Sequence, residues 1–280
     1  MKTYKILPGF LAGLIVLVAG PVRTAAQLQE FEIPRQPDVI YVPTPTVVVE
    51  EMMRMAAIKP GEMVYDLGCG DGRIVIAAAR DFGARGIGVD IDPLRIAESK
   101  ENADKAGVSD RVQFQQADLF TMDFSDADVV MLYLLPALNV RLRPRLLDEL
   151  RPGTRIVSHA FMMGDWQPDE RAEVGDPEKS VFFWVIPAKV AGDWKVRLPD
   201  GKEGTLVLQQ EYQMVSGTLQ RDGRSTPLTN GKVKGTQLSF TFGDGVQATR
   251  VTASVSGSRF TGVQQQGAAG GSDPWSGERK

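Results

Sequence analysis

Residues 64–73 read Val-Tyr-Asp-Leu-Gly-Cys-Gly-Asp-Gly-Arg, and this stretch decides the fold of the N-terminal part of the chain. The apolar residues 62–67 predict a short buried strand. Residues 73–80 read Arg-Ile-Val-Ile-Ala-Ala-Ala-Arg and predict a buried helix. The glycines between them therefore belong to a turn that leads from a strand into a helix.

An acid followed by alternate glycines marks this turn. Gly68, Gly70 and Gly72 lack a Cβ, so the backbone can take positive φ and a ligand can come into contact with it. A dinucleotide-binding fold would space its glycines as G-x-G-x-x-G. Here Asp66 ends the strand and glycines follow at every second position, which indicates a different adenosine cofactor.

The pattern resembles motif I of the Rossmann-like, class I methyltransferases that use S-adenosylmethionine. The resemblance implies that the turn passes under the methionine part of the cofactor. Residues 86–90 predict the second strand, and Asp90 ends it 18 residues after Gly72. A carboxylate at this point can accept hydrogen bonds from both ribose hydroxyls. The simpler alternative is that Asp90 caps the next helix, although Asp92-Pro93 already supplies a cap and a first residue.

A third acid ends the next predicted strand, which covers residues 112–118. The family places an acid here to receive the adenine amino group, and Asp118 fits, with Leu119 or Phe120 beside the ring. Asp118 could equally be an ordinary loop acid. The predicted cofactor-binding residues are Asp66, Gly68, Gly70, Gly72, Asp90, Asp118 and Leu119.

Five segments make the resemblance more specific, and they point to bacterial relatives of the ATP synthase c-subunit lysine N-methyltransferase family. They are Tyr41-Val-Pro-Thr44, the stretch from Asp66 to Ala79, Asp118-Leu-Phe120, Leu135-Pro136 and Trp166-Gln-Pro-Asp169. The similarity covers most of residues 38–186. It implies methyl transfer to a protein lysine, with the segment before the first helix and the fourth-strand loop as walls of the site.

Two residues are candidates for catalysis because a lysine amine, with a pKa of about 10.4, must lose a proton before it attacks. Tyr133 and His159 end the predicted fourth and fifth strands, at the edge where such sheets gather ligands. His159 could equally be a packed, structural residue, and Tyr133 could belong to the core. Residues 161–166 could line an acceptor groove or form a folded apolar lid. Since no Cys/His cluster has zinc spacing, no metal is expected.

The first 26 residues have the pattern of a secretory signal peptide. A basic start precedes an apolar run at residues 10–19, and Gly20-Pro21 and Thr24-Ala-Ala26 follow it. We expect cleavage after Ala26 and export to the periplasm or the medium. Cys69 is the only cysteine, so no lipid-attachment cysteine lies near that point. Contact with the membrane is expected only if the leader stays uncleaved as an anchor.

Two domains are predicted after the leader. Residues 27–188 alternate strands and helices, as in a mostly parallel sheet covered by helices on both faces. Their first helix is expected to have Thr44 as N-cap and Pro45 at its first position. Residues 189–280 instead predict a small antiparallel β-barrel or sandwich of about seven strands, with turns at Asp222-Gly223 and Asn230-Gly231 among others.

The charge pattern weighs against nucleic acid as a partner, since the net charge is -3 and no long basic run occurs. One alternative function stays open at this stage. The chain could be a catalytically degenerate methyltransferase fold that serves as an exported binding or structural protein, because S-adenosylmethionine is a cytoplasmic metabolite.

Overall fold

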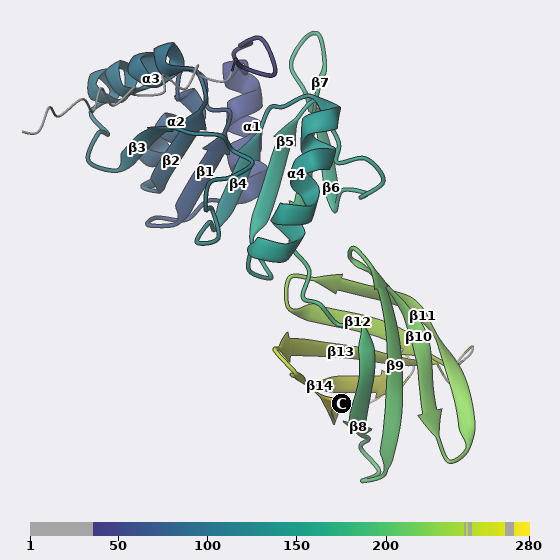
Figure 1. The fold of residues 1–280 in the computed structure, drawn as a ribbon. Helices are drawn as coiled ribbons and strands as arrows, with labels where there is room; N and C mark the ends of the chain where they lie inside the picture. Colours follow the sequence, from purple (N-terminus) through teal and green to yellow (C-terminus); the bar gives the residue numbers. More distant parts are fainter. Residues whose placement is uncertain (1–35, 244, 246–247, 267–271) are drawn as a thin grey trace, which may run out of the picture. The chain divides into compact units, whose positions relative to one another are not determined.

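The computed structural model describes residues 36–243, 245, 248–266 and 272–280, shown as a ribbon in Figure 1. The predicted leader, residues 1–26, lies outside this range. In the described part of the chain, no helix is both long and apolar enough to cross a bilayer. A seven-stranded sheet with four helices is followed in sequence by a β-barrel.

The sheet has the order β3-β2-β1-β4-β5-β7-β6. Its first five strands are parallel, and β7 and β6 form an antiparallel hairpin at one edge. The bounds are β1 Met63–Leu67, β2 Arg85–Asp90, β3 Val112–Gln116, β4 Val129–Leu132, β5 Arg155–His159, β6 Glu170–Val174 and β7 Lys179–Val185. This confirms the predicted Rossmann-like methyltransferase fold.

Helices cover both faces of this sheet. The helices are α1 Thr46–Ala56, α2 Arg73–Phe82, α3 Pro93–Ala106 and α4 Pro136–Glu149. Apolar residues of α1, α2 and α3 share one buried cluster with one face of the sheet, whereas Leu142 and Leu146 of α4 belong to a second cluster on the other face. Figure 1 shows α4 in front of β5 and α1 behind the sheet. The two clusters are the two hydrophobic layers that hold a mostly parallel sheet.

The predicted cap of α3 is confirmed, and glycines end α2 and α3. Gly83 and Gly107 adopt left-handed conformations just after α2 and α3, and the Asp92 side chain accepts a hydrogen bond from the backbone of Leu94 at the start of α3. The prediction for α1 was wrong by one residue. Pro45 is the N-cap, and the Thr44 hydroxyl lies 3.4 Å from the Nδ1 atom of His159. The Thr44 hydroxyl therefore contacts His159, which is distant in sequence, and does not cap α1.

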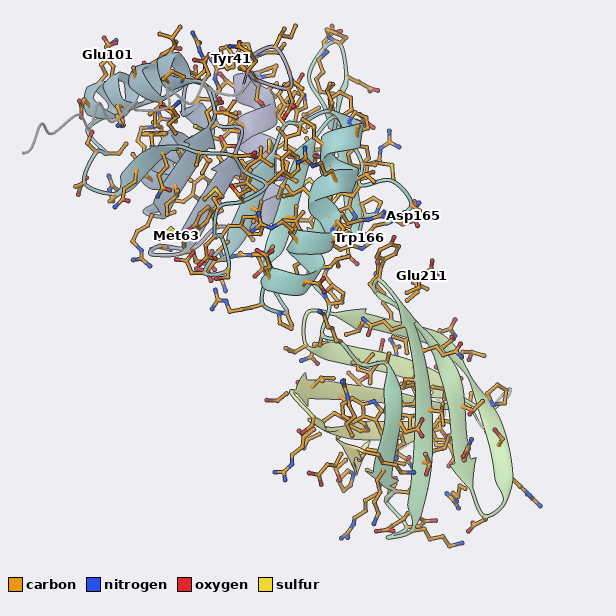
Figure 2. The ribbon with its side chains drawn as sticks, viewed as in Figure 1. Tyr41, Met63, Glu101, Asp165, Trp166 and Glu211 are labelled. Atoms are coloured by element: carbon orange, nitrogen blue, oxygen red, sulfur yellow. The ribbon has the colours of Figure 1, made fainter. Side chains whose placement is uncertain are left out.

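The carboxyl ends of the parallel strands meet at one edge of the sheet. Met63 begins β1 and lies at the opposite end of the domain from Tyr41, as Figure 2 shows. The chain from residue 37 to residue 44 passes over this edge before α1 begins, and we call it the strap. Strand-end acids, the glycine turn and the strap are therefore brought together.

The barrel is closed, and its eight antiparallel strands have the order β10-β11-β12-β13-β14-β15-β8-β9. The bounds are β8 Gly192–Arg197, β9 Glu203–Glu211, β10 Met214–Arg221, β11 Arg224–Lys234, β12 Gln237–Phe242, β13 Thr249–Ser256, β14 Arg259–Gln266 and β15 Ser272–Arg279. Buried aromatic rings pack inside it, with Phe260 5.3 Å from Trp194 and 5.4 Å from Trp275 between ring centres. Every second residue along strands such as β13 thus faces a packed interior.

One strand of the barrel, β11, was missed by the prediction of about seven strands. The turn at Asp222-Gly223 is confirmed, because both residues have positive φ and join β10 directly to β11. Asn230-Gly231 is not a turn but lies inside β11. Asn230 takes a positive φ of 53° where the pairing with β12 shifts register. A bulge within a strand uses the same residue types as a hairpin turn, so the pattern was ambiguous.

Candidate active site

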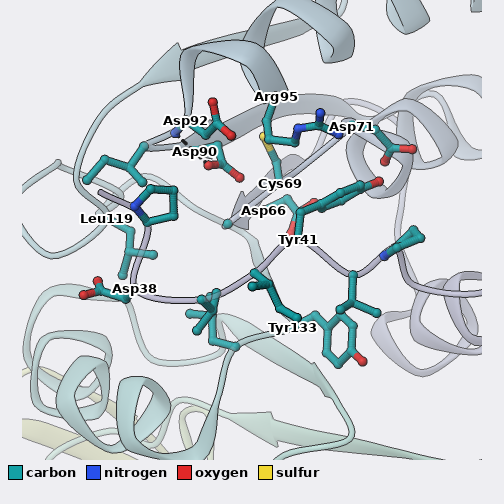
Figure 3. Close-up of a pocket in the computed structure, with 18 of the residues that line it drawn as sticks. Asp38, Tyr41, Asp66, Cys69, Asp71, Asp90, Asp92, Arg95, Leu119 and Tyr133 are labelled. Carbon is teal, nitrogen blue, oxygen red and sulfur yellow. Dashed lines mark hydrogen bonds between the residues drawn. The ribbon is translucent and has the colours of Figure 1, made fainter. Parts of the chain in front are cut away.

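A pocket opens at the carboxyl edge of the sheet, bounded by the ends of β1, β2 and β4, the turn after β3, and the strap (Figure 3). Acids dominate its polar lining. Among the described residues that line it, six carry carboxylates and two carry guanidinium groups: Asp38, Asp66, Asp71, Asp90, Asp92, Asp118, Arg73 and Arg95. A pocket with this excess of negative charge favours a cationic ligand.

The glycine turn lies between β1 and α2 as predicted. The backbone N–H groups of Gly68 and Cys69 donate to the carbonyl of Val89, which ties the turn to β2. Gly70 has a φ of 52°, and a Cβ built on it would lie 2.2 Å from the ring of Tyr41. A Cβ built on Gly72 would lie 2.6 Å from the ring of Phe114. Gly68 lines the pocket, whereas the missing side chains of Gly70 and Gly72 make room for packed aromatic rings.

Asp90 is held rigidly at the end of β2. One carboxylate oxygen accepts a 3.0 Å hydrogen bond from the Gly70 backbone, and the other accepts a 2.9 Å bond from the Asp92 backbone. Each oxygen has a second lone pair, so the carboxylate can still accept from hydroxyl groups in the pocket that it lines. It therefore has the position and the remaining capacity that a ribose clamp requires.

Asp66 is the most unusual group of the site. It is only 1% exposed and lines the pocket, and among the residues that the structure describes neither carboxylate oxygen has a hydrogen-bond partner. Burial, with the neighbouring charges of Asp90 and Asp71, raises the pKa of Asp66 to about 8. A buried carboxyl group without a partner carries a large desolvation cost. A ligand cation placed against it would relieve that cost, so the site fits the positively charged end of a cofactor.

Asp118 and Leu119 lie together in the turn after β3, and both line the pocket. The Asp118 carboxylate accepts a 2.9 Å hydrogen bond from the backbone of Phe120, which fixes its direction. Phe120 itself packs under the guanidinium group of Arg141, at 3.7 Å from the ring centre. Leu119 is therefore the apolar neighbour of Asp118 that faces the pocket.

The strap is fixed over the pocket at two residues. Tyr41 packs on Gly70 and lies 4.7 Å from the Arg95 guanidinium group, and burial together with Asp71 raises its pKa. Figure 3 shows Tyr41 beside Arg95 and Asp71. At the second position, Arg73 donates a 2.9 Å hydrogen bond to the Thr44 carbonyl and pairs with Asp71 through two nitrogens.

Tyr133 and His159 come together as a stacked pair. Their ring centres lie 3.9 Å apart with 30° between the planes. Tyr133 is partly exposed and lines the pocket, whereas His159 is 1% exposed, and no described residue forms a hydrogen bond with its Nε2 atom. Burial, reinforced by the charge of Lys179, lowers the pKa of His159 to about 4. His159 is therefore neutral at physiological pH and lies behind Tyr133.

A buried polar network supports the segment after β5. Asn139 of α4 is fully buried and donates to the Ser158 hydroxyl and to the Phe161 carbonyl, to which Ser158 also donates at 2.7 Å. Ala160, which lies between Ser158 and Phe161 in sequence, has a positive φ of 64°. This conformation costs energy for a residue with a side chain. Phe161 in turn stacks on Tyr133, 6.2 Å between ring centres.

Sequence reasoning missed several of these residues, among them Arg95, Arg73, Asn139 and Ser158. Each acts through contacts between distant segments, and no local pattern identifies it. Residues 161–166 could have lined a groove, but they do not share one environment. Met163 and Trp166 are fully buried, whereas the other four are partly or fully exposed. Among the residues that the structure describes, no group of three or more His, Cys, Asp or Glu side chains could hold a metal ion.

Comparison with known proteins identifies the class of enzyme. The family model for the ANTKMT methyltransferase domain matches residues 66–170. A protein-lysine N-methyltransferase of Saccharolobus islandicus is 44% identical over 153 residues, which make up 54% of this chain and 95% of that protein. An ATP synthase c-subunit lysine N-methyltransferase of Xenopus laevis is 33% identical over 129 residues, 46% of this chain and 56% of that protein.

A solved structure agrees with these relatives. An RNA methyltransferase from Salinibacter ruber, in complex with S-adenosyl-L-homocysteine, is 50% identical in sequence and superposes with a TM-score of 0.52. The match covers 53% of this chain and 96% of that one. S-adenosyl-L-homocysteine is what remains of S-adenosylmethionine after methyl transfer, so its presence there supports S-adenosylmethionine as the cofactor here. The chain belongs to the class I S-adenosylmethionine-dependent methyltransferases of the ANTKMT type.

Proposed function

We propose that the protein is a protein-lysine N-methyltransferase. Two lysine methyltransferases are among its relatives, and one of them is matched over nearly its whole length. The observation that carries the proposal is the composition of the pocket, which is lined by six aspartates and two arginines. A lysine side chain reaches an active site as a cation, and this pocket attracts cations.

The predicted residues have distinct roles in this proposal. Asp90 binds the ribose hydroxyls, because its carboxylate is already oriented by two backbone N–H groups. Asp118 and Leu119 receive the adenine ring, and Asp66 faces the cationic part of the cofactor because no described residue forms a hydrogen bond with its carboxylate. Gly68, Gly70 and Gly72 shape the turn that brings these groups together.

Bound S-adenosylmethionine supplies a methyl group on a sulfonium, which is already activated for attack by an amine. The protein's contribution is then to align the two groups and to exclude water, which is worth up to ~7–11 kcal/mol when positioning is near ideal. Tyr133 and the apolar residues Leu134 and Leu138 line one part of the pocket. An amine that enters this apolar part loses hydration, which favours its neutral, nucleophilic form.

RNA is the competing acceptor, because the Salinibacter ruber protein is described as an RNA methyltransferase. The charges of this chain argue against it. Proteins that bind nucleic acid neutralise phosphates with Lys and Arg, whereas this pocket has an excess of carboxylates and the whole chain has a net charge of -3. A role as a degenerate binding protein is also less favoured, since Asp66, Asp90 and Asp118 are all present at the site.

Transfer of labelled methyl groups distinguishes these acceptors. Extract of the source cells is incubated with the purified protein and methyl-labelled S-adenosylmethionine, and the label is then located by digestion and mass spectrometry. We expect it on lysine side chains, at a rate that rises with pH as the amine deprotonates. Asp90→Ala should remove it. Label in RNA, lipid or small molecules alone would contradict the lysine assignment and leave the methyltransferase class intact.

We also propose that the protein is exported, on the basis of its N-terminal sequence. Mass spectrometry of the envelope fraction should then find an N-terminus near Gln27. A chain that begins at Met1 and stays in the cytoplasm would contradict the proposal.

A further inference from the structure

His159 touches two residues that line the pocket but does not line it itself. Its Nδ1 atom lies 3.4 Å from the Thr44 hydroxyl, and its ring stacks on Tyr133. Thr44 belongs to the strap and Tyr133 follows β4, so these two walls come from segments far apart in the sequence. All three side chains meet at the end of β5, where Thr44 is 3% exposed and His159 is 1% exposed.

We propose that His159 is a positioning residue, which fastens the strap to β5 and holds Tyr133 against the pocket, and that it does not take the proton of the acceptor. The inference depends on the methyltransferase class and on cofactor binding, and it holds for any acceptor. Thr44 is then the residue by which the strap is held. Its hydroxyl contacts His159 at the end of β5, and its carbonyl accepts from Arg73 at the start of α2.

The Thr44 contacts explain why this residue is suited to that role. Arg73, at the start of α2, donates to its carbonyl, and Asp71 in the glycine turn holds Arg73 in place. His159 contacts its hydroxyl from the other side, at the end of β5. In the view of Figure 3 the strap crosses between Asp66 and Asp90, above it, and the ring of Tyr133, below it. Release of either contact would free the end of the strap nearest to α1.

The environment of His159 opposes a role as general base. A base works best when its pKa is near the working pH, and burial has lowered the pKa of this imidazole to about 4. The titratable groups near it are Tyr133, on the face of its ring, and Lys179 on β7, and the charge of Lys179 opposes an imidazolium ion, as burial does. Within the described part of the chain, the buried Nε2 atom has no hydrogen-bond partner to which a proton could pass.

Paired substitutions in the full-length protein separate positioning from base catalysis. Thr44→Val removes the hydroxyl at nearly constant volume, and His159→Phe keeps a ring against Tyr133 but removes Nδ1. Thr44→Ser restores the hydroxyl. Thr252→Val is a matched control, because Thr252 is exposed on β13 of the barrel. Circular dichroism first establishes that each variant is folded.

Two measurements need only S-adenosylmethionine as the probe. The first is its dissociation rate, followed by displacement with S-adenosyl-L-homocysteine. The second is hydrogen–deuterium exchange of residues 38–44. We expect Thr44→Val and His159→Phe each to raise the dissociation rate about three- to tenfold and to speed exchange in the strap. The double variant should be no worse than either single one, because both remove the same contact. Thr44→Ser should stay within about twofold of the original protein.

Two results would overturn the inference. The first is that dissociation and strap exchange are unchanged in both Thr44→Val and His159→Phe. The second is that methyl transfer into the cell extract falls a hundredfold or more in His159→Phe, with an altered pH profile between pH 6 and 9, while Thr44→Val transfers normally. That pattern would identify His159 as a base. A failure to label lysine would affect neither measurement, so this inference and the proposed acceptor are tested separately.

Discussion

The two halves of the sheet edge are built differently. At the ends of β1 and β2 the edge carries acids, and nearby backbone N–H groups hold one of them, Asp90, which accepts from Gly70 and Asp92. After β4 and β5 it carries the Tyr133–His159 stack, supported by Asn139 and Ser158. The first half is specified by residues close together in sequence, and the second by packing. We infer that the first half recognises the cofactor and the second shapes the acceptor site.

The largest effect is expected from Asp90→Ala. The change removes a charged acceptor of two backbone hydrogen bonds as well as the proposed ribose contacts, and charged hydrogen bonds are worth roughly 1.5–3 kcal/mol each. Affinity for S-adenosylmethionine, measured by calorimetry, should fall by about a hundredfold or more. Asp110→Ala, at an exposed acid, is the control. A dissociation constant within about threefold of the original would remove Asp90 from the cofactor site.

Gly70→Val is next. A Cβ at this position meets the Tyr41 ring at 2.2 Å, and φ is already positive, so the turn or the strap must move. Cofactor binding should be lost while circular dichroism shows an intact fold. A second comparison sharpens the result, between the single variant Gly70→Ala and a double variant that also carries Tyr41→Ala. If binding returns in the double variant, the glycine serves to seat Tyr41, and if it does not, the cofactor itself uses the space.

Tyr133→Phe tests whether the two halves act separately. The change keeps the ring that stacks on His159 and removes only the hydroxyl. We expect binding of S-adenosylmethionine to stay within about threefold, whereas methyl transfer into cell extract falls about tenfold or more, as when a group near the reacting atoms is lost. Equal loss of binding and transfer would contradict the division between a cofactor half and an acceptor half.

Asp66→Asn should have the smallest effect, on stability. In the folded protein the pKa of Asp66 is raised to about 8, whereas its ordinary value is 3.8. As pH rises from about 4 to about 8 the unfolded chain releases this proton and the folded chain keeps it, so the group destabilises the cofactor-free protein progressively. The difference in Tm between Asp66→Asn and the original protein should therefore be a few degrees more favourable to the variant at pH 8 than at pH 5. Asp110→Asn should show no such change. An identical pH dependence of Tm in all three proteins would show that Asp66 is ionised or solvated.

The sequence predicted the first half of the edge better than the second, for a physical reason. The Asp92 cap and the alternation of strands and helices follow from local patterns, and the structure confirms them. Thr44 was assigned to a helix cap because a local rule fits it, but its hydroxyl contacts a histidine 115 residues away. Asn139 and Arg95 have no local signature at all. Asn230-Gly231 shows the same limit in the barrel, since only the register of β12 distinguishes a bulge from a turn.

The most direct test of cofactor binding at this edge is calorimetric titration of the purified chain, without its first 26 residues, with S-adenosylmethionine. We predict one site per chain, competition by S-adenosyl-L-homocysteine, and loss of the heat signal in Asp90→Ala. Absence of binding by a folded protein, or equal binding by Asp90→Ala, would contradict the assignment of this edge as the cofactor site.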